Sequence, residues 1–509
     1  MSADGGGGRG YTQQGNYEYF DPGVQRLNTG ALVKIISMLD KQDLESLLAT
    51  FFSSYAVIED TKLYAKSLTL AEGPLRAMQG MLGEALQHHL VSFLAITPSH
   101  LRLESVQHDF AEIVLRMTNI TSLDLSLCHY YFTDAGVKRI AQLTDVGLEK
   151  VCNFKQLTTL ILGPAYFASR FVEYGELPGL TKAGLQHLHK LTHLRKLGLG
   201  DWRSMTKADF ECITHLAGLT HLDLSDCRQI EDDWFLNIGR LQTLTSVNLR
   251  GCIKLTYTSL CHLPEHLTSL NIENLKDDGD LNEIGRFKQL THLRIQCESF
   301  ITQDILWRIG LLTELTSLSI LAHYAGFDSA GLVHITNLTK LTSLTFQSTE
   351  DNALTDAGMA HICELHNLTS LELNECHLSN MALQYLAKLT ELRSLNLSSS
   401  CYGGDLGALI ALPYLTTLSL EHSGITDETL IQIGQCKHLT SLNLYGCESI
   451  TSNGILELIV KLKKLTKLNV VDCENIAEEC VEAIQAFRGP QGVIELGFIN
   501  EAPNSIRWF

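Results

Sequence analysis

One short hydrophobic pattern, Leu-x-x-Leu-x-Leu, dominates this chain and predicts its fold. The pattern occurs fourteen times, with conservative replacements, and the copies begin at Ile120, Leu157, Leu194, Leu219, Leu244, Leu267, Leu290, Leu315, Leu341, Leu368, Leu392, Leu415, Leu439 and Leu465. After two steps of 37 residues, successive copies start 23 to 27 residues apart. Self-similarity at this period predicts a solenoid, because each unit can bury its apolar face only against its neighbours.

The repeat from Leu439 to Leu458 shows how the pattern translates into local structure. Leu442 and Leu444 alternate with polar residues, as expected for a short strand with one buried face. Thr451 is placed to cap a helix that returns apolar residues to the core. Similar capped starts recur at Thr133, Thr181, Thr355 and Thr426. We therefore predict an α/β solenoid shaped as a horseshoe, with parallel strands on the inner curve and helices on the outer curve.

The changes of pattern along the chain divide it into five predicted parts. Residues 1–19 form a Gly-rich, polar tail that we expect to be disordered, and residues 20–66 form a small helical unit. Residues 67–118 provide a linker helix and N-terminal capping repeats, including an early strand at 101–103. Residues 119–487 form the solenoid. Residues 488–509 form a C-terminal cap that begins with a strand, because exposed leucine layers need lids.

Cysteines recur at one position of the repeat, three residues after its last leucine-type residue. They are Cys128, Cys227, Cys252, Cys376, Cys447 and Cys473. Equivalent positions of successive coils stack, so we predict a buried column of free thiols that behave as small apolar groups. These units, with Cys after the strand and Thr-Asp-x-Gly-Leu at the helix start, resemble the cysteine-containing class of leucine-rich repeats.

The helical unit at 20–66 lacks the repeat and has apolar stripes with helical spacing. Thr29 and Asp40 are placed to cap two successive helices. The apolar residues concerned are Leu27, Leu32, Ile35, Ile36, Leu39, Leu44, Leu47 and Leu48. Their order resembles an F-box, a three-helix unit that docks on a Skp-type adaptor of a cullin ubiquitin ligase. The resemblance implies that these residues bind the adaptor; the alternative is a helical cap for the solenoid, which would also need apolar stripes.

Polar residues line the expected inner curve, where Ser or Thr precedes the second leucine and Asp or Asn precedes the third. We interpret most of them as small side chains that hydrogen-bond sideways between stacked strands. Aromatic and basic residues are better binding anchors. We therefore select as candidates for target binding Tyr166, Phe167, Phe171, Tyr174, Trp202, Arg203, Arg250, Arg294, His422 and Tyr445. The four aromatics at 166–174 lie in an over-long loop, where they either form a small local core or anchor a partner.

Composition and charge limit the partners and the cellular compartment that we expect. The net charge of −18, from 39 Lys+Arg against 57 Asp+Glu, argues against a nucleic-acid partner. No apolar run reaches the length of a membrane span, and Met1 to Gly10 lacks the apolar core of a secretory signal. We expect a cytoplasmic or nuclear protein that keeps its thiols reduced. If its source is bacterial, the expectation becomes export into a host cell.

Signals of catalysis are missing from the sequence. It has no phosphate-binding Gly-x(4)-Gly-Lys-Ser/Thr loop and no Cys-x-x-Cys pair. No cysteine has a neighbouring base that would mark a nucleophile. We therefore expect neither cofactor nor metal, and a non-catalytic adaptor that presents an unknown target protein to the ligase. The alternative is a leucine-rich-repeat scaffold or regulator unrelated to ubiquitin.

Overall fold

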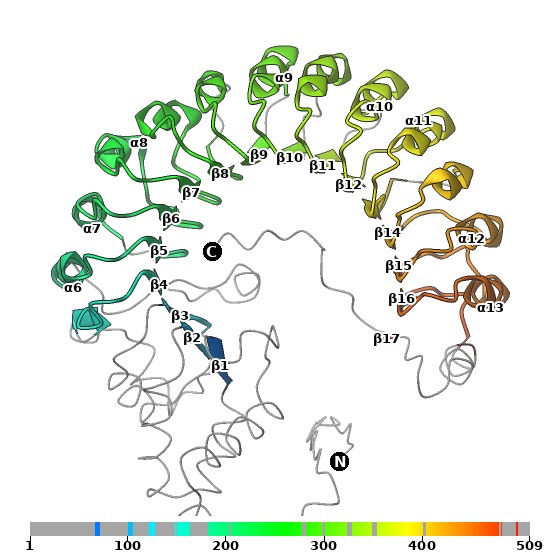
Figure 1. Cartoon of the computed structure of the whole chain (residues 1–509), viewed down its shortest axis with the longest axis horizontal. Helices are drawn as coiled ribbons and strands as arrows, with labels where there is room; N and C mark the ends of the chain where they lie inside the picture. The colour runs from blue at the N-terminus through cyan, green and yellow to red at the C-terminus, as the bar shows by residue number, and fades with distance from the viewer. Residues whose placement is uncertain are drawn as a thin grey trace, which may run out of the picture.

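The repeats stack into an open arc with strands inside and helices outside (Figure 1). The computed structural model describes residues 67–71, 100–104, 122–127, 148–149, 151–162, 182–202, 205–276, 281–297, 301–322, 328–348, 354–400, 404–477, 480 and 495–496. The predicted horseshoe solenoid is confirmed. The F-box-like segment, the predicted linker helix and the N-terminal tail lie outside the described residues.

A single parallel sheet of 17 strands forms the inner curve. Its strands are β1 (Ser67–Ala71), β2 (His100–Glu104), β3 (Ser122–Leu127), β4 (Thr159–Ile161), β5 (Lys196–Gly198), β6 (His221–Asp223), β7 (Ser246–Asn248), β8 (Ser269–Ile272), β9 (His292–Cys297), β10 (Ser317–Ala322), β11 (Ser343–Ser348), β12 (Ser370–Asn374), β13 (Ser394–Asn396), β14 (Thr417–Ser419), β15 (Ser441–Asn443), β16 (Lys467–Asn469) and β17 (Glu495–Leu496). Each strand pairs with the next in the chain. The leucine-type positions of neighbouring strands align, as Leu222 does with Val247 and Leu293 with Leu318. The strands expected at 101–103 and near 495 are present, whereas β1 was not predicted.

Short helices form the outer curve, and several are 3₁₀ helices (η) rather than the predicted α-helices. The helices are α6 (Lys182–Gln186), η2 (His187–Lys190), α7 (Lys207–Ile213), α8 (Asp232–Phe235), η3 (Ile238–Arg240), η4 (Tyr257–His262), η5 (Asn282–Arg286), α9 (Gln303–Gly310), η6 (Ser329–Asn337), α10 (Asp356–Ile362), α11 (Asn380–Tyr385), η7 (Leu386–Lys388), η8 (Gly407–Ala411), α12 (Asp427–Ile433) and α13 (Ser452–Lys461). Thr355 caps α10 as expected, accepting from Gly358 N at 3.2 Å. Thr451 precedes α13, but its hydroxyl donates to Asp427 of the preceding coil at 2.7 Å, so this predicted cap bonds between coils.

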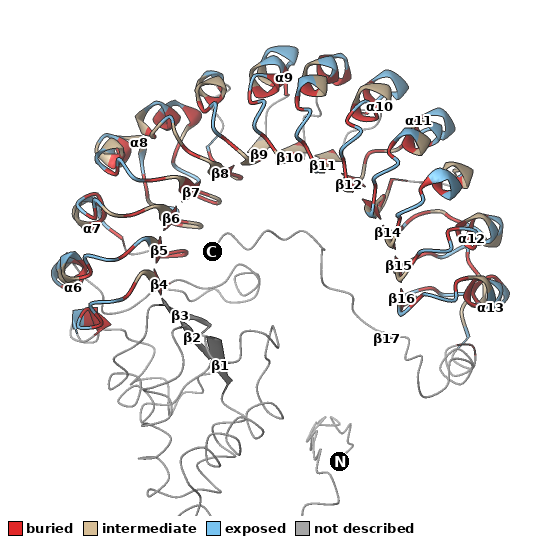
Figure 2. Ribbon diagram, in the orientation of Figure 1, coloured by how far each residue is buried: buried red, intermediate tan, exposed pale blue. Residues whose placement is uncertain are grey.

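The core lies between the strands and the helices. Leu222, Leu249, Leu373 and Leu444 are at most 1% exposed, as the repeat assignment requires. Figure 2 shows buried residues on the inner sides of the helices and exposed residues on their outer sides. Each coil therefore buries its leucines against both neighbours, and the inner surface of the sheet is left to polar residues.

Threonine hydroxyls tie successive coils together and explain the regular Leu-Thr-Ser-Leu spelling. Thr268 Oγ1 donates to the Thr245 carbonyl at 3.1 Å, and Thr291 Oγ1 donates to the Thr268 carbonyl at 2.9 Å. The backbone N–H of each threonine bonds the same carbonyl, at 2.7 Å for Thr268. Threonines that donate in this way are Thr220, Thr245, Thr268, Thr291, Thr316, Thr342, Thr369, Thr416, Thr440 and Thr466. One residue type at one position therefore satisfies the same carbonyl in coil after coil.

The predicted cysteine column is buried, and its thiols are hydrogen-bond donors. Cys227, Cys252, Cys376 and Cys447 are fully buried, and Cys473 is 7% exposed. Cys447 Sγ donates to the Leu420 carbonyl of the preceding coil at 3.1 Å. Burial raises the pKa of the Cys376 and Cys447 thiols to about 12, so both are protonated and poor nucleophiles at neutral pH. Cys128 lies outside the described residues.

Candidate functional site

Three positions of each repeat face the inner surface of the arc: the residue before the second leucine, the residue between the second and third leucines, and the residue after the third. Stacking of the coils turns these positions into three rows of side chains, which we call the first, middle and last rows. In the coil of β7, Ser246, Asn248 and Arg250 face inward, because the alternating Val247 and Leu249 are buried in the core. The equivalent positions of every coil lie side by side, as the strand register requires. The surface open to a partner is therefore set by the residues before, between and after the last two leucines of each repeat.

Asp and Asn side chains of the middle row lie at or next to the ends of six strands. Their Oδ1 atoms accept from the backbone N–H two residues ahead, at 2.8 to 3.2 Å, and these residues are Asp223, Asn248, Asn271, Asn396, Asn443 and Asn469. Sideways bonds of the predicted kind also occur, as from Asn443 Nδ2 to Glu421 Oε2 at 3.4 Å. The predicted role, sideways hydrogen bonding between stacked strands, was nevertheless incomplete. These side chains also form turns within their own coils.

Most turns that follow this row have one residue in the left-handed region. Positive φ values mark Asp201, Asp226, Gly251, Asn274, Glu375, Ser399, His422, Gly446 and Asp472. In the middle of the arc the pattern changes: Arg294, Ser319 and Thr345 replace Asp or Asn, and β9, β10 and β11 each extend over six residues. The sheet is therefore wider along these three strands than along β4 to β8 and β12 to β16.

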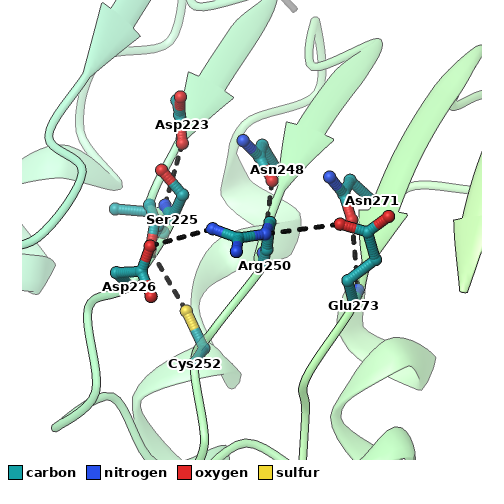
Figure 3. Close-up of polar contacts among 9 residues, drawn as sticks. Asp223, Ser225, Asp226, Asn248, Arg250, Cys252, Asn271 and Glu273 are labelled. Carbon is teal, nitrogen blue, oxygen red and sulfur yellow. Dashed lines mark hydrogen bonds and ion pairs between the residues drawn. The ribbon is translucent and has the colours of Figure 1, made fainter. Parts of the chain in front are cut away.

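An ion-pair chain crosses the inner surface from the coil of β6 to β9. Arg250 Nη1 lies 3.1 Å from Asp226 Oδ2, and Arg250 Nε lies 3.4 Å from Glu273 Oε2 (Figure 3). Arg294 Nε bonds the other Glu273 oxygen at 2.7 Å. The Glu273 side chain is only 4% exposed, whereas those of Arg250 and Arg294 are 17% and 34% exposed. Both arginines are therefore on the predicted surface, but their guanidinium groups already have internal partners.

A second cluster lies toward the C-terminal end of the arc. The His422 and Tyr445 rings meet edge to face, with centroids 5.0 Å apart. A hydrogen bond to Asp472 raises the pKa of the Tyr445 hydroxyl. Both His422 and Tyr445 were selected from the sequence as target-binding candidates, without a predicted contact between them. The structure brings them together from adjacent coils. They form an aromatic pair that is accessible, since His422 is exposed and Tyr445 is half-buried.

The remaining target-binding candidates have different outcomes. Trp202 is a correction: its side chain is fully buried, because it lies three residues after Leu199 and so occupies the cysteine column. Arg203 and the aromatic loop residues Tyr166, Phe167, Phe171 and Tyr174 lie outside the described residues. The same holds for the adaptor-binding candidates Leu27, Leu32, Ile35, Ile36, Leu39, Leu44, Leu47 and Leu48.

Glu372 is an inner-surface residue that sequence reasoning missed. It lies in the middle row of β12, next to Thr345 in the register, and Thr345 Oγ1 donates to Glu372 Oε2 at 3.4 Å. Burial raises its pKa, and the positive charge of Arg294 opposes this shift only in part. The sequence contained a signal for this residue, because position 372 is a glutamate where many other repeats have Asn or Asp. Our sequence prediction did not use it.

The raised pKa of Glu372 predicts how the stability of the fold depends on pH. A carboxyl whose pKa is raised by folding stabilises the native state most below its ordinary pKa of about 4.3. That contribution is lost as the pH rises through the folded-state pKa. We therefore expect the Glu372→Gln variant to gain stability relative to the wild type as the pH rises from about 4 toward neutral. The measurement is the urea midpoint of both proteins across this range.

Glu364→Gln is the matched control with the opposite sign. A hydrogen bond from Lys388 Nζ at 2.8 Å lowers the pKa of Glu364, so this carboxylate stabilises the fold above its ordinary pKa. That contribution is lost as the pH falls, and the wild type should therefore gain on this variant as the pH rises. If both variants shifted in the same direction, the account of Glu372 would be wrong.

Neither a membrane-spanning helix nor a cluster of metal-ligating side chains is found among the described residues. None of their helices is both long and apolar enough to cross a bilayer. Among the same residues, no group of three or more His, Cys, Asp or Glu is arranged to hold a metal ion.

Comparison with known proteins supports the repeat assignment. A family model for a leucine-rich repeat region matches residues 222–477, which is 256 of the 509 residues, and a leucine-rich-repeat model matches residues 116–141. No curated protein matches the sequence.

Three solved structures are similar at low sequence identity. An internalin from Listeria monocytogenes is 20% identical with a TM-score of 0.38, over 70% of this chain and 82% of the internalin. A leucine-rich-repeat protein of Leptospira interrogans is 17% identical with a TM-score of 0.39, over 78% and 93% of the two chains. A chain from the yeast Rad7–Elc1 complex is 18% identical with a TM-score of 0.40, over 65% and 90%.

Proposed function

The chain belongs to the leucine-rich-repeat family, and from this premise we propose that it is a non-catalytic adaptor for a ubiquitin ligase. In this proposal the inner surface of the arc binds a target protein. The N-terminal F-box-like segment binds a Skp-type adaptor of a cullin ligase core. The chain would then contribute proximity, by holding the target where ubiquitin is transferred.

The inner surface is the observation that carries the target-binding part. Leucine-rich repeats are a protein-binding architecture, and this arc presents one continuous parallel sheet with polar side chains along its length. Its ion-pair chain and its His422–Tyr445 pair provide charged and aromatic contacts of the kinds found in interfaces. The buried thiols of the described column do not supply a catalytic nucleophile, because their pKa values are raised.

The sequence order at 27–48 supports the ligase part. Leu32, Ile36 and Leu39 lie at helical spacing, as an F-box needs to dock its apolar face on an adaptor. An acidic residue at such a contact would leave a charge buried in the interface, so Leu32→Asp and Ile36→Asp should each abolish adaptor binding.

A pulldown with the full chain and a purified Skp-type adaptor tests this part of the proposal. The wild type should retain the adaptor, and Leu32→Asp and Ile36→Asp should not. Leu236→Asp is the matched control, because Leu236 is 61% exposed beside α8 and its change should leave binding intact. Absence of wild-type binding, or equal binding by all four proteins, would exclude the ligase link and leave a leucine-rich-repeat scaffold.

A further inference from the structure

Two carboxylates on the inner surface differ from their neighbours in having no ion-pair partner among the described residues. Inner Asp226 and Glu273 pair with arginines, and several outer carboxylates pair with lysines, as in Lys254–Glu231 at 2.7 Å and Lys340–Glu314 at 2.6 Å. Glu372 and Glu375, by contrast, form no ion pair with any described Lys or Arg. Glu372 accepts one long bond from Thr345, and Glu375 accepts one from Gln347 Nε2 at 3.1 Å.

Two further polar atoms beside these carboxylates lack partners. Ser319 Oγ and Asn374 Oδ1 are buried and have no hydrogen-bond partner among the described residues. Ser319 is 6% exposed, and it faces the inner surface because Leu318 and Ile320 on either side are in the core. Orphaned buried polar atoms of this kind cost free energy and call for an explanation such as a missing ligand.

These groups form one continuous surface across three strands. Ser319 of β10 pairs with Thr345 of β11, and Thr345 pairs with Glu372 of β12. One step further along the same strands, Gln347 pairs with Asn374. We call this surface the acceptor patch, and it consists of Ser319, Thr345, Gln347, Glu372, Asn374 and Glu375.

The acceptor patch needs hydrogen-bond donors and positive charge. The nearest cation, Arg294, bonds Glu273 at 2.7 Å on the other side and forms no ion pair with Glu372 among the described contacts. Counting Glu273, Arg294, Glu372 and Glu375 together leaves two negative charges without a positive partner. An arginine side chain offers five N–H donors in a planar fork together with a permanent positive charge.

We propose that the acceptor patch binds an arginine side chain in a basic segment of the target protein. This inference rests on the proposed function, because it names the chemistry of the partner that the inner surface receives. The guanidinium would satisfy Asn374 Oδ1 and form charge-assisted bonds with the Glu372 and Glu375 carboxylates. Arginine should be favoured over lysine, whose ammonium has three donors and no planar fork.

Fluorescence anisotropy with labelled peptides tests the proposal on the full chain. The probes are three twelve-residue peptides that differ only in repeating Gly-Arg-Ser, Gly-Lys-Ser or Gly-Glu-Ser. The arginine peptide should bind, the lysine peptide should bind more weakly, and the glutamate peptide should not bind. Glu372→Gln and Glu375→Gln should each weaken arginine-peptide binding by roughly tenfold or more, because each removes one charge-assisted bond.

Glu314→Gln is the matched control, because it removes the same charge from an exposed carboxylate that already pairs with Lys340. It should leave arginine-peptide binding nearly unchanged, and circular dichroism should show all three variants folded. Equal weakening by Glu314→Gln and Glu372→Gln, equal binding of the lysine peptide, or no binding of the arginine peptide would each overturn the proposal. These results are independent of the Skp pulldown, so failure of the patch and failure of the ligase link are distinguishable.

Discussion

Replacing Trp202 with alanine should lower the free energy of unfolding by about 3 to 5 kcal/mol, the usual effect of truncating a buried aromatic side chain. Trp202 is fully buried and is the largest of the fully buried side chains in the described core. It occupies the column that cysteines fill in other coils, so alanine would leave a cavity between stacked leucines. Urea unfolding followed by circular dichroism measures the loss.

Trp307→Ala provides the comparison for this prediction. Trp307 lies on the outer curve in α9 and is 44% exposed, so much of its ring is already in water. Its truncation should change stability by only about 1 kcal/mol, because little apolar surface is lost from the core. Equal losses for the two variants would contradict the placement of Trp202 in the cysteine column.

Replacing Glu273 with glutamine should destabilise the fold by about 3 kcal/mol, because breaking a buried ion pair leaves the partner charges uncompensated. Glu273 is 4% exposed and contacts the guanidinium groups of both Arg250 and Arg294. Asp226 still neutralises Arg250 in this variant, but Arg294 loses its 2.7 Å partner. The urea midpoint at neutral pH and low salt measures the effect.

Glu265→Gln removes a comparable ion pair at the surface. Glu265 is 70% exposed and lies 3.0 Å from Arg286. Exposed pairs of this kind contribute at most about 1 kcal/mol, so this variant should stay close to the wild type. A loss from Glu265→Gln as large as that from Glu273→Gln would show that burial does not make the inner ion pairs special.

The solenoid was predictable because the leucine pattern that determines it repeats at a regular spacing. Leucines at fixed spacing determine which side chains are buried, and Leu222, Leu249, Leu373 and Leu444 are in the core as expected. The cysteine column followed from the same spacing. The threonine ladder was also present in the spelling Leu-Thr-Ser-Leu, but only the structure shows that its hydroxyls reach the preceding coil.

The candidate site was harder to predict, because residue type was weighed above repeat position. Trp202 was selected as an aromatic anchor, although its distance from Leu199 places it in the buried column. Arg250 and Arg294 were selected as basic binding anchors, but their ion-pair partners come from neighbouring coils and only stacking brings them together. Glu372 was overlooked, although a glutamate in the row of Asn and Asp residues was a signal within its own repeat.

The type of each helix and the length of each strand were the features that the sequence predicted least well. Several coils have 3₁₀ helices in place of α-helices, η6 over nine residues, and the repeat pattern alone does not distinguish the two. The six-residue strands β9 to β11 occur where Arg294, Ser319 and Thr345 replace the turn-forming Asp or Asn. The absence of Asp or Asn does not by itself predict a long strand, because β4, β5 and β14 also lack it and have three residues each.

The use of the inner surface for protein binding is tested most directly by photocrosslinking from opposite faces of one coil. Benzoylphenylalanine at Ser317, half-buried on the inner surface of β10, is compared with the same residue at Val333, which is 41% exposed in η6. Our account predicts that native cells yield a discrete protein adduct from position 317 and none from position 333. Adducts from position 333 alone would contradict it, because the partner would then bind the outer curve.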